Sequence, residues 1–195
     1  MRQDYILKMM MMTYKHNNNN NNNERLTSHF SVGEFRCKCG KSHDTKLDGE
    51  LVEKLEELYN LLDCSKIIVN SGYRCPDHDR NVGGSGGGMH TKGQAADIVC
   101  YDKLGNIIPS GVVCCAAQEI GFGGIANIDS TYTAVHVDTR SGNKWYGDEA
   151  VPGGTSASVC TDFYKYYGLD KAENDVKTGI VEIDGVKYKY TLEKV

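Results

Sequence analysis

The spacing of apolar residues predicts two helices in the middle of the chain. Between residues 48 and 62, leucine and valine recur at intervals of three and four, the period of a helix with one buried face. Asp48 is suited to cap the first turn, and Glu50 and Lys54 are spaced for an ion pair on the exposed face. A second helix is expected over residues 110–120, because this apolar run stops at Gly121.

Shorter apolar or alternating runs predict strands between and after these helices. The runs lie at residues 67–69, at 94–102, and in two pieces of 123–140 joined by a turn around 127–130. Helices and strands alternate, but without a regular βαβ rhythm. We therefore predict an α+β fold, with a small antiparallel sheet that is flanked by helices.

The two ends of the chain differ from its middle. Seven consecutive asparagines, 17–23, predict a disordered leader over residues 1–25, which leaves 26–150 as the main domain. Residues 151–195 are expected to form an extension with a short helix near 161–168. Alternating residues around Asp184 and Gly185 predict a C-terminal β-hairpin. The hairpin is either an edge pair packed on the domain or a separate binding module, and the low stability of two isolated strands favours the first.

Charge and hydropathy exclude several classes of protein. A net charge of -4 argues against a nucleic-acid partner, and no stretch approaches the ~20 apolar residues of a membrane span. We recognise no secretory signal, so we expect synthesis in the cytoplasm and eight cysteines that are mostly thiols. We also expect a monomer.

Strand alternation brings three candidate metal ligands together. Asp97 and His136 lie opposite each other if their strands are antiparallel neighbours, and a glycine-rich loop, 83–88, brings His90 to the pair. Two imidazoles and one carboxylate leave a fourth zinc position for water, as in a catalytic site for amide or ester hydrolysis. Taken singly, either histidine can be a surface residue and Asp97 a capping carboxylate.

Several motifs in order resemble one known family. They are "HFSVGEFRCKCG", "SGYRCPDHDRNVGG", "GMHTKGQAADI" and "AVHVDTRSGNKW", which together span about residues 29–147. They resemble the zinc D-alanyl-D-alanine carboxypeptidases, a family of peptidoglycan peptidases that includes endolysins cutting the L-alanyl-D-glutamate bond and shares its fold with the hedgehog signalling domain. The resemblance implies a zinc peptidase with stem peptides as substrate and with His90, Asp97 and His136 as ligands. It also implies that Arg74 stabilises the developing oxyanion.

The sequence departs from the family pattern at two positions. Gly88 stands where the family has a serine, two residues before the first ligand. Thr133 stands where many members have the acidic general base, and a threonine cannot accept a proton from water at neutral pH. Asp138 is the first candidate for the base and Asp129 the second. Either carboxylate can instead orient a metal ligand.

A second group of candidate ligands lies in "CKCGKSH". Cys37, Cys39 and His43, joined by Cys75, can bind a structural zinc, but the Cys-x-Cys spacing is tighter than usual. Paired or packed thiols are the favoured interpretation of these cysteines.

Three functions remain open from the sequence. The first is a zinc peptidase of the cell wall, made without a signal peptide and released by lysis as phage endolysins are. The second is a zinc-containing wall-binding module that has lost catalysis, which the threonine at position 133 motivates. The third is a zinc-free structural protein.

Overall fold

The computed structural model describes residues 12–14, 24–150, 157–169, 176–183 and 186–193. Within the predicted leader, β1 (Met12–Tyr14) pairs antiparallel with β2 (Thr45–Leu47). Most of the predicted leader lies outside the described residues. The asparagine run itself lies outside the described residues.

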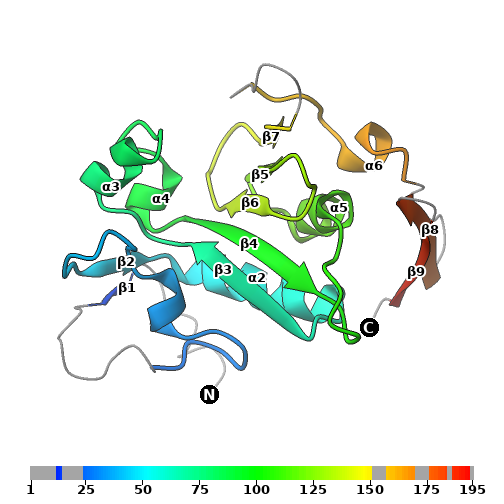
Figure 1. Cartoon of the computed structure of the whole chain (residues 1–195), viewed down its shortest axis with the longest axis horizontal. Helices are drawn as coiled ribbons and strands as arrows, with labels where there is room; N and C mark the ends of the chain where they lie inside the picture. The colour runs from blue at the N-terminus through cyan, green and yellow to red at the C-terminus, as the bar shows by residue number, and fades with distance from the viewer. Residues whose placement is uncertain (1–11, 15–23, 151–156, 170–175, 184–185, 194–195) are drawn as a thin grey trace.

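A five-stranded sheet forms the centre of the protein (Figure 1). Its strands, in order across the sheet, are β3 (Lys66–Ser71), β4 (Ala95–Tyr101), β6 (Val135–Asp138), β5 (Gly124–Asn127) and β7 (Trp145–Asp148). The first four pair antiparallel, as predicted, whereas β7 pairs parallel with β5. The sheet is mixed because residues 139–144 carry the chain from β6 to the far edge of β5.

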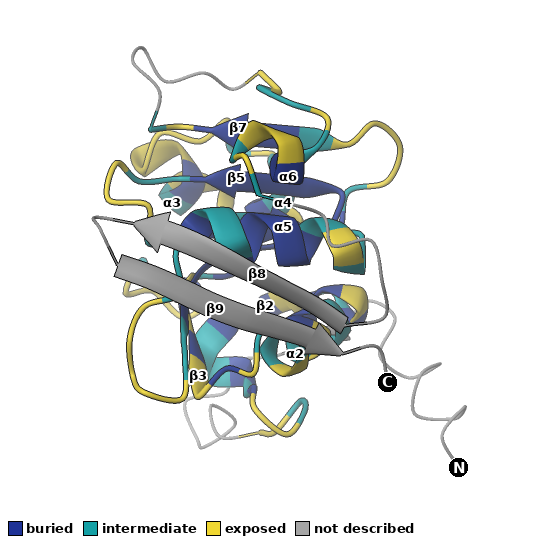
Figure 2. Ribbon diagram, turned by 90° about the vertical axis from the view of Figure 1, so that its right-hand side faces the viewer, coloured by how far each residue is buried: buried dark blue, intermediate teal, exposed yellow. Residues whose placement is uncertain are grey.

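Two predicted helices cover one face of the sheet and form the core with it. They are α2 (Gly49–Leu61), capped by the Asp48 side chain, and α5 (Ser110–Ile120), which ends at Gly121 with a φ of 87°. Figure 2 shows that most of α5 and β5 is buried. Alternate side chains of the strands face this core, among them Ile98, Val135 and Val137. No helix among the described residues is long and apolar enough to cross a membrane.

The opposite face of β4 and β6 carries the polar side chains of Asp97, His136 and Asp138. Short helical elements lie beside this face. The 3₁₀ helix η2 (Val32–Phe35) precedes β2, while α3 (Pro76–Asn81) and α4 (Met89–Lys92) lie where β3 ends and β4 begins (Figure 1). Gly72 allows the chain after β3 to approach η2, because a side chain there would collide with the Phe35 backbone. Tyr73 N–H accordingly donates to the Phe35 carbonyl over 2.7 Å.

The predicted C-terminal elements are present. The helix α6 (Phe163–Tyr166) packs with α5, and Phe163 is fully buried. The strands β8 (Val176–Ile183) and β9 (Val186–Glu193) pair antiparallel along their whole length. Ile183 lies opposite Val186 at the end of the ladder next to the turn. The hairpin forms a sheet of its own and does not extend the five-stranded sheet. Its predicted turn, 184–185, lies outside the described residues.

Candidate metal centre

Three side chains from three elements converge on one point beside the sheet. Asp97 of β4 and His136 of β6 are register partners, as the alternation predicts, and His90 approaches from α4. His136 Nδ1 lies 3.0 Å from Asp97 Oδ1, and His90 Nε2 lies 3.2 Å from each of these two atoms. Tetrahedral zinc ligands at bond lengths of about 2.0–2.1 Å are separated by roughly 3.3 Å. The three atoms therefore fit a zinc ion.

The outward nitrogen of each imidazole faces a hydrogen-bond acceptor. His90 Nδ1 donates to the Gly72 carbonyl over 2.8 Å, and His136 Nε2 donates to Asp138 Oδ2 over 3.0 Å. These acceptors fix the proton on the outer nitrogen and leave the inner nitrogen of each ring available to a metal. The sequence does not reveal the Gly72 carbonyl as a partner, since a backbone acceptor leaves no signal in a motif.

The electrostatics of the centre favour a positive charge between the ligands. Burial raises the pKa of Asp97, but hydrogen bonds with His136 and His90 lower it by more, so the pKa lies well below its usual range. Burial by itself lowers the pKa of His136, yet its hydrogen bonds to Asp138 and Asp97 raise it to about 9. A cation bound here replaces the charge of the proton that His136 otherwise holds.

Asp138 lies behind His136, on the side away from Asp97. Its carboxylate is completely buried, and it accepts hydrogen bonds from the backbone N–H and guanidinium of Arg140 as well as from His136. Burial raises the pKa of Asp138, but His136 and Arg140 lower it well below its usual range. Gly124 leaves room for this carboxylate, because a side chain there would collide with it.

Arg74 contacts the other oxygen of the Asp97 carboxylate. Its Nη2 donates to Asp97 Oδ2, and its Nε donates to Ser71 Oγ over 2.8 Å. Its Nη1 lies 3.5 Å from the buried carboxylate of Asp79, which also accepts the Gly86 N–H over 2.8 Å. Asp79 thus links Arg74 to the glycine-rich loop, a role that sequence reasoning missed.

Asp129 lies in the turn between β5 and β6 and is occupied by that turn. Its carboxylate accepts the Thr133 hydroxyl over 2.6 Å and the N–H groups of Thr133 and Ala134 over 2.9 and 3.2 Å. Burial raises the pKa of Asp129, but these hydrogen bonds lower it below its usual value. The described contacts of Asp129 are those of a turn-stabilising residue.

Trp145 and Arg140 complete the wall beside His136, and the sequence did not predict either role. The Trp145 and His136 rings meet edge to face with centroids 5.9 Å apart, and the Arg140 guanidinium lies 4.9 Å from the Trp145 ring. The parallel strand β7 brings Trp145 to this place. The motif "HVDTRSGNKW" was the available signal, because it carries both residues shortly after His136.

The fold and centre define an α+β protein with a three-residue candidate metal site. The family model for Peptidase M15 matches residues 28–138. This match covers more than half of the 195 residues, so the chain belongs to the Peptidase M15 family. A search of curated proteins finds none that matches the chain.

Proposed function

We propose that the protein is a zinc peptidase that hydrolyses a peptide bond in the stem peptides of peptidoglycan. The observation that carries this proposal is the convergence of His90 Nε2, Asp97 Oδ1 and His136 Nδ1, with a separation of 3.0–3.2 Å. Zinc, when bound, supplies the Lewis acidity that lowers the pKa of a water ligand and polarises a carbonyl. Membership in a peptidase family supports hydrolysis as the reaction.

Around that centre, we assign a separate task to each polar neighbour. Arg74 presents a permanently charged fork of donors beside the ligand carboxylate, which suits it to stabilise negative charge on the substrate carbonyl oxygen. Asp138 holds the ring of His136 with its inner nitrogen toward the metal. The substrate bond is either the terminal D-alanyl-D-alanine bond or an internal bond of the kind that endolysins cut.

One observation favours a second candidate, a zinc-containing wall-binding module without catalysis. Both carboxylates that the sequence nominates as base, Asp138 and Asp129, already accept several hydrogen bonds. Thr133, at the usual position of the base, donates its hydroxyl to Asp129. A centre that holds zinc but lacks a free base would bind stem peptides without cutting them.

Purified full-length protein and isolated cell walls distinguish these candidates. We expect bound zinc in the protein, and we expect release of D-alanine or of new amino groups from the walls. D-alanine identifies a carboxypeptidase, whereas new amino groups alone identify an endopeptidase. Chelation should stop the reaction and added zinc should restore it. Binding to walls without cleavage supports the module, and a protein with neither zinc nor cleavage contradicts both candidates.

Asp138→Asn separates a positioning role from a role as general base. If Asp138 orients His136, the variant should bind zinc at the peptidase site about 10–100-fold more weakly, because an outer partner of a ligand has been weakened. Its cleavage rate should then recover at saturating zinc. Competition with a chelating dye measures the affinity, and cleavage assays at increasing zinc measure the recovery.

The base role predicts the opposite pattern for the same variant. Zinc affinity would be unchanged, the rate would stay low at every zinc concentration, and the acidic limb of the pH–rate profile would move. Asp129→Asn is the matched control, since it weakens only the bonds of the turn and should leave zinc affinity as in the wild type.

A further inference from the structure

A second group of four side chains lies on the loop after η2 and at the start of α3. Cys37, Cys39 and His43 come from the loop, and Cys75 is the N-cap residue of α3. The three sulfur atoms and one imidazole nitrogen all lie within 4.8 Å of one another. Cys39 Sγ lies 2.9 Å from His43 Nε2. The fold thus brings a residue from more than thirty positions downstream to a loop that already holds three candidate ligands.

Each sulfur atom accepts at least one backbone N–H. Lys41 N–H donates to Cys39 Sγ over 3.4 Å, Cys75 N–H donates to Cys37 Sγ over 3.3 Å, and His78 N–H donates to Cys75 Sγ over 3.4 Å. Such bonds stabilise the thiolate form, which is the form that binds metal. The Lys41 N–H lowers the pKa of Cys39 to about 7, whereas burial raises the pKa of the Cys37 thiol to about 11. Each sulfur atom nevertheless has a backbone donor that can support a metal-bound thiolate.

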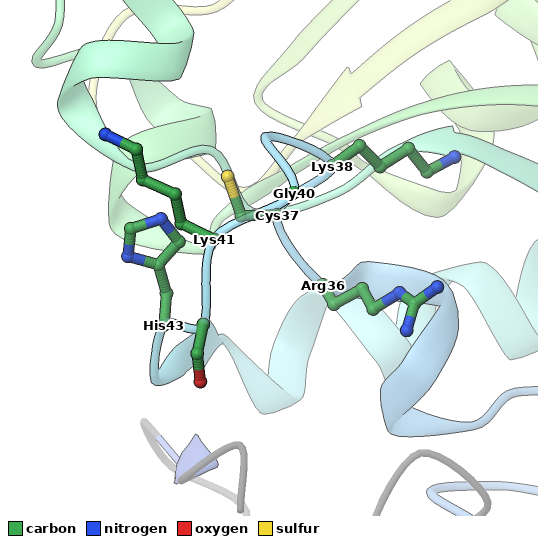
Figure 3. Close-up of a pocket in the computed structure, with 7 residues that line it drawn as sticks. Arg36, Cys37, Lys38, Gly40, Lys41 and His43 are labelled. Atoms are coloured by element: carbon green, nitrogen blue, oxygen red, sulfur yellow. The ribbon is translucent and has the colours of Figure 1, made fainter. Parts of the chain in front are cut away.

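The surroundings of the cluster are basic. Arg36, Lys38 and Lys41 are among the residues that line the pocket at this loop. Figure 3 shows Lys41 and His43 on one side of Cys37, while the side chains of Arg36 and Lys38 extend away from them. Three thiolates and a neutral imidazole around Zn²⁺ carry a net charge of −1. The cationic residues that line this pocket are compatible with such a charge.

A disulfide accounts for less of this arrangement than a metal does. A bond between two of the cysteines would leave the third thiol and His43 without a reason to converge on the same point. Four ligands of the Cys₃His type match a closed structural zinc site, in contrast to the three ligands around Asp97.

We propose that Cys37, Cys39, His43 and Cys75 bind a structural zinc ion, separate from the centre formed by His90, Asp97 and His136. The Cys-x-Cys spacing argued against this in the sequence, but the fold brings Cys75, already a candidate fourth ligand in the sequence, to the other three side chains.

The proposed zinc joins the loop to the segment that supplies the other centre. Lys38 Nζ already donates to the carbonyls of Val69 and Asn70 at the end of β3. The residues just before Cys75 include Gly72, whose carbonyl accepts His90 Nδ1, and Arg74, which contacts Asp97. The structural zinc therefore fixes the backbone on which these contacts depend.

Metal content and cobalt spectra test the second site independently of peptidase activity. We expect two zinc ions per wild-type chain and one in Cys39→Ser. Replacing zinc with Co²⁺ should give intense thiolate-to-cobalt absorption in the wild type and in Asp97→Asn, because only the Cys₃His site contains sulfur. Cys160→Ser is the matched control, since Cys160 is half-buried and outside the cluster.

Two measurements on the wild type keep the test decisive if Cys39→Ser fails to fold. Cysteines of the cluster should react with a thiol reagent only after chelation, and the intact mass should correspond to eight free thiols. Absence of the cobalt–thiolate absorption, or a mass lower by two hydrogen atoms with Cys37 and Cys75 linked, would overturn the proposal. Either result would leave the peptidase proposal standing.

Discussion

Asp97→Asn is expected to remove zinc from the His90–Asp97–His136 centre and to abolish peptide hydrolysis. Asp97 supplies the carboxylate of the set, and its Oδ1 faces both inner nitrogens. An amide at this position lacks the negative charge that the cation requires. Since a bound metal supplies several kcal/mol of transition-state stabilisation, we expect activity to fall about 1,000-fold or more.

Zinc stoichiometry and wall cleavage measure this effect together. The variant should hold one zinc ion fewer than the wild type, and added zinc should not restore the rate. Asp63→Asn is the matched control, because the Asp63 side chain is 83% exposed and contacts only the surface residue Lys103 among the described ion pairs. Wild-type cleavage by Asp97→Asn would contradict the assignment of this centre.

Local periodicity carried enough information to predict most of the core. The helix that follows Asp48 is amphipathic over several turns, so its buried face can be identified without a structure. The strands around Asp97 and His136 are short, largely apolar runs that the fold buries on both faces, and their polar residues mark the face of the candidate centre. Alternation along these strands placed Asp97 opposite His136, which the strand register confirms. This half of the candidate centre follows from pattern because both residues belong to neighbouring antiparallel strands.

The remaining parts depend on contacts that no local pattern records. The helices α3 and α4 have six and four residues, which is too short to establish a helical period. The parallel pairing of β7 depends on where the chain crosses β5, and it brings Trp145 to His136. Cys75 joins the cysteine cluster through the tertiary fold, so the sequence could name it as a candidate ligand but could not place it beside "CKCGKSH".

Asp138 illustrates why the type of a residue and the strand face on which it lies do not determine its role in a site. The sequence placed it correctly on the His136 face of β6, but a carboxylate there can accept a proton from water or orient the ring. The deciding contact is with Arg140, only two residues away, whose guanidinium and backbone both donate to Asp138. A carboxylate held by a cation and by the outer nitrogen of His136 is a poor proton acceptor, which favours the positioning role that we propose.

Arg74→Lys is expected to lower the rate of hydrolysis about 100–1,000-fold while zinc remains bound. This is the loss of rate that follows when an enzyme loses one hydrogen-bond donor to a developing oxyanion. The guanidinium donates to Asp97 and Ser71 at once and still lies 3.5 Å from Asp79. A lysine ammonium keeps the charge but cannot reproduce this planar set of donors. We therefore expect kcat to fall with little change in KM.

Steady-state cleavage of a synthetic stem peptide, with zinc analysis of the same sample, checks this expectation. Arg80→Lys is the control, because Arg80 forms an exposed ion pair with Asp77 and should tolerate the exchange. Loss of zinc together with activity would mean that Arg74 acts by holding Asp97 in place, and an unchanged rate would remove it from the mechanism. If the variant keeps its zinc but has a lower kcat, Asp97 still holds the metal without the guanidinium. The guanidinium must then act on the substrate.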